Sequence, residues 1–126
     1  MSFASVQIKL NANRIEAPTA LANGTTAIEM QGDLVAMMIN KMREENIETI
    51  EARAEAAEKW ATDIQEMNDK TLFPLTNSWY MGANIPGKKR EQLNYLAGLD
   101  TYEKVCNEQI HSWSGFELTR NAKSAH

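Results

Sequence analysis

The segment from Ser78 to Arg90, SWYMGANIPGKKR, holds the densest set of side chains able to do chemistry. It combines two aromatic residues, an amide, two glycines and three cations. Glycines let a ligand approach the backbone closely, cations neutralise phosphate or carboxylate, and a tryptophan can stack or donate one hydrogen bond. Two interpretations follow from these residue types. The segment is either a loop that binds an anionic ligand or a surface turn with a solvated basic cluster and a buried tryptophan.

Outside this segment, few residues can exchange a proton near neutral pH. His111 is a candidate acid or base, because imidazole titrates in that range, although a histidine late in a helix also interacts with the last carbonyls. Tyr80 and Tyr95 can donate to a substrate oxygen, and burial beside an apolar stretch would raise the pKa of Glu29. The alternatives are packing roles for the tyrosines and solvent exposure for Glu29. We predict catalytic roles for His111, Tyr80 and Glu29.

The counts of cysteine and histidine argue against two other kinds of site. Cys106 is the only cysteine of the chain. His111 lies five positions further on, about 140° away around a helix, so the two do not form a local nucleophile–base pair. With two histidines in the chain, a zinc site would need carboxylates as ligands. We predict no metal site.

Composition and charge limit the class of protein. The 126 residues fit a single domain, 1–126, with ordinary globular composition. A net charge of −4 argues against nucleic acid or an anionic membrane as partner. The longest purely apolar run, 34–39, is far too short to span a membrane, and the first residues lack the pattern of a signal peptide. We therefore expect a cytoplasmic protein.

Hydrophobic periodicity predicts a mainly α fold with minor short strands. Two long helices, 26–44 and 47–67, are expected to pack as antiparallel neighbours because their connection is short. A third helix is predicted to begin at Asp100, in a capping box with Glu103, and to end at Gly115. The short strands are expected within 2–10, 92–96 and 116–118.

The segment 78–88 resembles the mobile loop that contacts the nicotinamide in the Baeyer–Villiger monooxygenases. The resemblance extends over 16–119 and includes APTALAN at 17–23, Trp60, TLFP at 71–74, YLAGL at 95–99, Tyr102, Cys106 and the Gly115-Phe116 pair. It implies that Trp79 hydrogen-bonds to a nicotinamide cofactor. We predict that Trp79, Asn84, Lys88 and Tyr95 contact the ligand. The chain resembles only the last, C-terminal part of such enzymes, after both nucleotide-binding domains, and residues 1–15 resemble no part of the family.

The sequence also departs from the family pattern. It has neither of the two G-x-G-x-x-G dinucleotide motifs and none of the histidine- and tryptophan-containing fingerprint, so we predict that it binds no FAD and has no cofactor of its own. We interpret the chain as a truncated homologue that acts as a cofactor-independent enzyme on a small oxygenated metabolite. Cyclase, isomerase, dehydratase and ring-opening reactions in secondary metabolism remain open. The alternative is a non-catalytic binding or partner subunit of a full-length monooxygenase.

The predicted helix 26–44 indicates a homodimer. Its run of six consecutive apolar residues, 34–39, goes around the whole helix, because consecutive residues are about 100° apart. One partner helix cannot cover all of these side chains. A two-fold interface with a second copy is the commonest solution.

Overall fold

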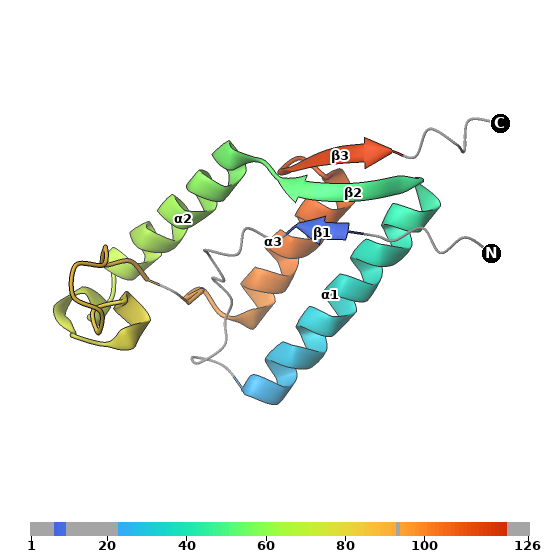
Figure 1. The fold of residues 1–126 in the computed structure, drawn as a ribbon. Coiled ribbons are helices and arrows are strands. Elements are labelled where there is room, and N and C mark those ends of the chain that lie inside the picture. Colours follow the sequence, from blue (N-terminus) through green and yellow to red (C-terminus); the bar gives the residue numbers. More distant parts are fainter. Residues whose placement is uncertain (1–6, 10–22, 93, 121–126) are drawn as a thin grey trace.

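The computed structural model describes residues 7–9, 23–92 and 94–120 of the chain. In chain order, the elements are β1 (Gln7–Lys9), α1 (Gly24–Glu44), β2 (Ile47–Ala52), α2 (Ala54–Asp69), the 3₁₀ turns η1 (Phe73–Leu75) and η2 (Trp79–Met81), α3 (Leu99–Ser112) and β3 (Phe116–Arg120). Figure 1 shows their arrangement. The fold class is mainly α with minor strands, as predicted. β1 lies within the strand expected over 2–10, and most of the novel segment 1–15 lies outside the described residues.

The first long helix agrees closely with the prediction. Asn23 caps α1, and its side-chain oxygen accepts from the backbone N–H groups of Thr25 at 3.1 Å and Thr26 at 3.3 Å. These bonds satisfy two donors that have no partner within the helix. At the other end Asn46 has a φ of 55°, in the left-handed region, and turns the chain directly into β2.

The second predicted helix was wrong in its first quarter, because Ile47–Ala52 forms β2 instead. Ile47 and Ile50 are both buried, and their spacing of three fits one face of a helix. In a regular strand they would face opposite sides, but the register irregularity between Ile47 and Thr49 interrupts the alternation of β2. The β-branched residues of this stretch favour a strand, and pairing with β3 decides the outcome. The helix α2 therefore begins seven residues later than expected.

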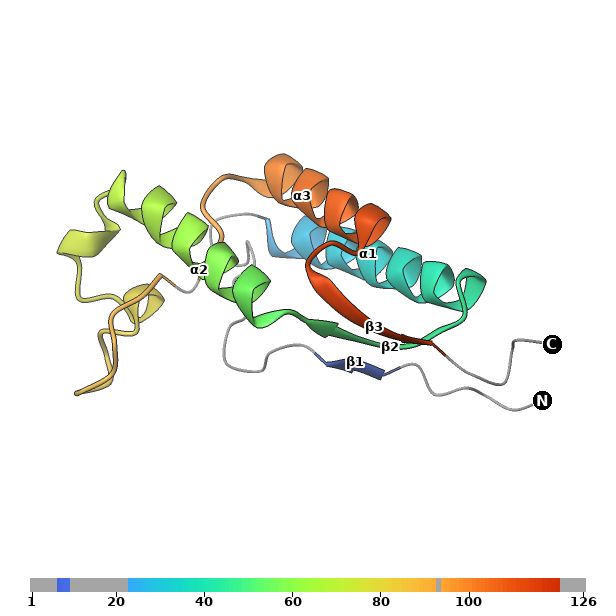
Figure 2. The same cartoon turned by 90° about the horizontal axis from the view of Figure 1, so that it is seen from above.

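The three strands form one sheet in the order β1-β2-β3. β1 pairs parallel with β2, and β2 pairs antiparallel with β3, with a register irregularity between Ile47 and Thr49. Helices α1 and α3 run side by side in the same direction over one face of this sheet (Figure 2). α1 and α2 run in opposite directions, as predicted (Figure 1). Among the described elements, however, α1 packs mainly against α3 and β2 rather than against α2.

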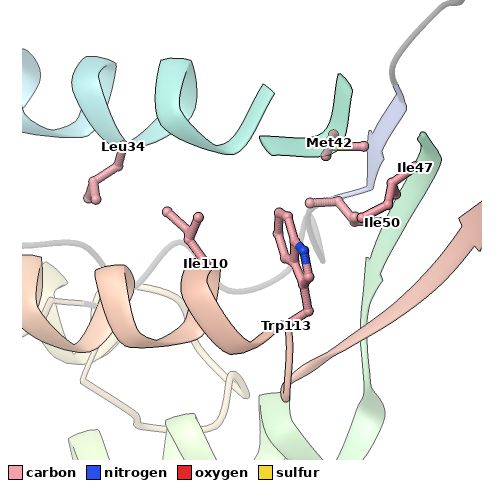
Figure 3. Close-up of a cluster of buried hydrophobic side chains, with 6 residues drawn as sticks. All are labelled: Leu34, Met42, Ile47, Ile50, Ile110 and Trp113. Carbon is pink, nitrogen blue, oxygen red and sulfur yellow. The ribbon is translucent and has the colours of Figure 1, made fainter. Parts of the chain in front are cut away.

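The main core lies where α1, α3 and β2 meet. Its buried side chains are Leu34, Met42, Ile47, Ile50, Ile110 and Trp113 (Figure 3). The indole N–H of Trp113 donates to Glu45 Oε2 at 2.9 Å, so this polar edge of the ring is satisfied inside the core. The Lys41 ammonium lies 4.8 Å from the centroid of the same ring. The face of α1 that points into the protein is thus fixed by α3 and the sheet.

Two details of the third helix differ from the prediction. α3 begins after Gly98, which has a φ of 88° and no side-chain cap, so the capping box of Asp100 and Glu103 does not form. The helix ends at Ser112 because Trp113 takes a left-handed φ of 55°, which turns its ring into the core. The predicted last strand is confirmed as β3.

The strand expected over 92–96 was also wrong, since the described residues of this stretch are irregular. Gln92 and Asn94 are buried, and their side chains bond locally and to α2. Gln92 Nε2 donates to Asn68 Oδ1 at 3.1 Å, and Asn94 N donates to Gln92 Oε1 at 3.1 Å. Asparagine and glutamine that bond in this way compete with a strand ladder.

Candidate functional site

The loop that carries Trp79 is held by local hydrogen bonds. Ser78 caps the 3₁₀ turn η2, because its Oγ accepts from Tyr80 N at 3.2 Å. Gly82 ends the turn with a φ of 62° and donates to Trp79 O at 2.9 Å. A left-handed residue is needed here, and glycine takes this conformation without steric cost. The backbone on both sides of Trp79 therefore has a defined conformation.

The Trp79 side chain is presented to solvent. It is 56% exposed, and its indole N–H donates to none of the described residues. One face is supported by Tyr80, with ring centroids 4.2 Å apart, and Tyr80 in turn packs edge-on against Phe73 at 5.9 Å. The interpretation that required a buried tryptophan does not fit this arrangement. An exposed ring whose indole N–H donates to none of the residues described fits a ligand contact better.

The three cations of the loop have different surroundings. All three are exposed, and Lys89 lies 3.6 Å from a carboxylate oxygen of Glu91. Arg90 is bound to the loop itself, because its guanidinium donates to the carbonyl of Thr76 at 2.6 Å and to Asn77 Oδ1 at 3.0 Å. Asn84 is exposed at the loop tip, near Lys88 in sequence. The charges available to a ligand are therefore mainly those of the two lysines.

Tyr95, the fourth residue predicted to contact the ligand, lies in a separate aromatic cluster. It is 2% exposed and stacks on Trp60, with centroids 5.3 Å apart and planes 8° from parallel. Tyr102 packs against both rings. Burial raises the pKa of Tyr95, and the nearby Cys106 and Asp63 raise it further. In this structure the ring of Tyr95 fills space between α2 and α3.

Cys106 borders the same cluster as a protonated thiol. Burial raises the pKa of Cys106 above its ordinary value, while a hydrogen bond with Tyr102 partly offsets that rise. Burial also raises the pKa of Tyr102. A thiol with a raised pKa is a poor nucleophile at neutral pH. That Cys106 and His111 do not form a catalytic pair stays a prediction.

The structure does not bring the three predicted catalytic residues together. His111 is exposed on the last turn of α3, Glu29 is exposed near the start of α1, and Tyr80 is half-buried in η2. The start of α1, the end of α3 and the loop with η2 lie at separate places in Figure 1. The backbone carbonyl of His111 accepts a hydrogen bond from Lys41 Nζ. Catalytic roles for these residues stay predictions.

Sequence reasoning missed an open depression of about 370 Å³ beside α2. Its lining residues are Glu58, Ala61, Thr62, Gln65, Lys89 and Glu91. The acidic residues of α2 carried a signal, but such a run on a helix more often marks a solvated face. Within the described ranges, no three His, Cys, Asp or Glu side chains are grouped to hold a metal ion. No described helix is long and apolar enough to cross a bilayer.

Over most of its length, the chain is similar in sequence to known monooxygenases. It is 44% identical over 104 residues to cyclopentanone 1,2-monooxygenase from Comamonas sp. (strain NCIMB 9872), a match that covers 82% of this chain and 19% of that protein. It is 42% identical over 81 residues to a Baeyer–Villiger monooxygenase from Pseudooceanicola batsensis (strain ATCC BAA-863 / DSM 15984 / KCTC 12145 / HTCC2597), covering 64% of this chain and 15% of the relative. No family model matches the chain.

A solved structure shows that the fold is shared as well. The crystal structure of cyclohexanone monooxygenase from Rhodococcus sp. Phi1 bound to NADP⁺ superimposes with a TM-score of 0.76 at 34% identity, over 84% of this chain and 20% of that one. Fold and loop together define a partial relative of flavin-dependent monooxygenases. The chain is homologous to the C-terminal part of the Baeyer–Villiger monooxygenases, as its sequence predicted. It spans about a fifth of the length of the curated relatives it matches.

Proposed function

We propose that this chain supplies the nicotinamide-facing loop of a Baeyer–Villiger-type monooxygenase. It would act together with dinucleotide-binding domains outside these 126 residues. The single observation that carries the proposal is the presentation of Trp79. Its ring is exposed, supported by Tyr80, and has an indole N–H without a partner among the described residues. The loop that holds it resembles the family's cofactor loop, and a relative's structure was solved with NADP⁺ bound.

The residues of the loop fit a nicotinamide dinucleotide. Trp79 can donate one hydrogen bond to a carboxamide or ribose oxygen, and its ring can cover a heterocycle. The exposed ammonium groups of Lys88 and Lys89 can neutralise phosphate. The cofactor itself would supply hydride when bound. The chain's part is to bind and orient the nicotinamide and to exclude water from one side of it.

The same residues do not fit a flavin. A flavin dinucleotide needs a glycine-rich turn at a helix N-terminus to hold its pyrophosphate, and the sequence contains no such motif. The helices α1 and α3 begin after Asn23 and Gly98, and neither N-terminus has a glycine-rich turn of this kind. The proposal therefore assigns the flavin to the partner domains.

A cofactor-independent isomerase, cyclase, dehydratase or ring-opening enzyme is the second candidate. It is supported by the depression beside α2, whose volume lies in the range of small-molecule sites and whose lining includes carboxylates and a lysine. His111, Tyr80 and Glu29 do not converge on that depression, so this function would need other residues. Glu58 and Lys89 are the first to test, because both line it.

A complementation assay separates the two functions. The purified chain is mixed with the part of the Comamonas relative that precedes the matching segment, loaded with FAD, and the oxidation of NADPH is followed with cyclopentanone. We expect ketone-dependent oxidation that Trp79→Ala abolishes and that the surface variant Lys59→Met leaves unchanged. The proposal is wrong if the mixture shows no ketone-dependent oxidation, or if Trp79→Ala supports the same rate.

A further inference from the structure

One cation of the loop, Arg90, is engaged by the protein rather than left for a ligand. Its Nη2 donates to Thr76 O at 2.6 Å and to Pro74 O at 3.4 Å, and its Nη1 donates to Asn77 Oδ1 at 3.0 Å. All three acceptors lie on the segment 74–77, which precedes η2. Arg90 itself lies on the segment that returns from the loop. Its side chain therefore closes the loop at its base.

Other contacts also join the two sides of the loop near this base. Glu91 N donates to Met81 O at 3.1 Å, and Phe73 meets Tyr80 edge-on. Among the hydrogen bonds of the described side chains, those of Arg90 join 74–77 to the returning segment. Trp79 lies between these attachment points, two residues after Asn77. Any change in 74–77 therefore moves the start of the turn that presents the indole.

We infer that Arg90 is a positioning residue that sets the place and orientation of Trp79. That Trp79 contacts a nicotinamide rests on the proposed function, but the contacts of Arg90 do not. The guanidinium holds its N–H donors in a fixed planar fork, so one side chain can reach all three acceptors within 74–77. A lysine at this position keeps the charge and loses the fork. Arg90 thus has a role distinct from that of Lys88 and Lys89, although the sequence shows three adjacent cations.

The three tryptophans of the chain give this inference an internal control. Labelling the whole chain with 5-fluorotryptophan yields fluorine resonances from Trp60 in the aromatic cluster, Trp79 in the loop and Trp113 in the core. Trp79→Phe assigns the loop signal. We expect Arg90→Ala to move the Trp79 signal towards that of free 5-fluorotryptophan, and to leave the other two in place. A general loss of structure would move all three.

Matched variants decide the outcome. Lys89→Ala removes a neighbouring exposed cation and should leave the Trp79 signal unchanged, whereas Arg90→Lys should move it almost as far as Arg90→Ala does. Exchange of the Met81 and Gly82 amide protons, which close η2, should be about tenfold faster in Arg90→Ala, because the turn opens locally more often. Asn77→Ala, which removes one acceptor, should move the signal in the same direction by a smaller amount.

The inference is overturned if Arg90→Ala leaves the Trp79 signal and the two amides unchanged. It is also overturned if Arg90→Lys leaves the Trp79 signal and the two amide exchange rates as in the parent chain, because the positive charge alone would then suffice. These measurements are made without nucleotide. They can therefore succeed while the complementation assay fails. Failure of these measurements contradicts the positioning role of Arg90, whereas failure of the complementation assay contradicts the proposed function.

Discussion

Replacing Lys41 by methionine should destabilise the chain more than the same exchange at Lys59, the lysine of α2. Lys41 lies in the last turn of α1, and its ammonium reaches the C-terminal end of α3. It donates to Ile110 O at 2.6 Å and to His111 O, and it lies 3.6 Å from Glu45 Oε1. It also covers the ring of Trp113. Methionine keeps much of the stem's packing and removes the donor and the charge.

The magnitude follows from the contacts. A hydrogen bond to a charged group contributes about 1.5–3 kcal/mol, and partial exposure reduces this. The Lys41 side chain is 20% exposed, and its positive charge also interacts favourably with the negative C-terminal end of the α3 dipole. Because the two bonds share one ammonium, we expect a total loss of about 2–3 kcal/mol in the free energy of unfolding. For a chain of this size, that lowers Tm by about 6–12 °C.

Lys59→Met is the matched control. The Lys59 ammonium is bound to Asp63 at 2.7 Å, but its side chain is 75% exposed. An exposed pair of this kind contributes less than about 1 kcal/mol. Urea unfolding followed by circular dichroism compares the two variants with the parent chain. Equal losses in both, or no loss in Lys41→Met, would refute the argument that Lys41 holds α1 to the end of α3.

Three further outcomes are expected. Gly32→Ala should stabilise the chain by up to about 1 kcal/mol, because Gly32 is in α1 with open space around it, whereas Gly82→Ala should destabilise it by about 1 kcal/mol because φ is 62° there; urea titrations compare the two. Burial raises the pKa of Tyr102 above 10.0 and that of Cys106 above 9.0, so the stability that these groups contribute is complete below about pH 9 and is lost as pH rises through the raised values. Urea titrations between about pH 8 and 11 should show a smaller loss of stability with rising pH in Tyr102→Phe than in the parent chain. Light scattering at micromolar concentration should give twice the chain mass of 14.2 kDa, since Val35 and Met37 on α1 are about half exposed, and a mass near 14.2 kDa would contradict the homodimer.

The long helices were predictable because their signals are local. The apolar spacing of α1 and the capping side chain of Asn23 lie within the helix or next to it. The strand β2 was missed because the spacing of three between Ile47 and Ile50 fits the helical period and not the strand period. A register irregularity interrupts the strand there, and the pairing partner β3 is more than sixty residues away in the sequence. The end of α3 was missed for a similar reason. Trp113 adopts a left-handed conformation because the core of α1 and β2 receives its ring.

The candidate site was predictable in part. The loop's residue types and its family resemblance marked Trp79, and the structure shows the exposed ring that a ligand contact needs. Sequence reasoning treated the three adjacent cations alike. Only the folded loop shows that the guanidinium of Arg90, although exposed, is bound to 74–77. The positions of His111 and Glu29 depend on how helices pack, which residue type alone does not specify.

The most direct test of the central claim is a titration of the 5-fluorotryptophan-labelled chain with NADP⁺ in the presence of the FAD-loaded partner domains. If the loop faces the nicotinamide, the Trp79 resonance shifts with saturation, and the Trp60 and Trp113 resonances stay in place. NAD⁺ added in place of NADP⁺ tests whether the phosphate matters to Lys88 and Lys89. A saturable shift confined to Trp79 is the predicted result. No shift of Trp79 at saturating nucleotide would contradict the account.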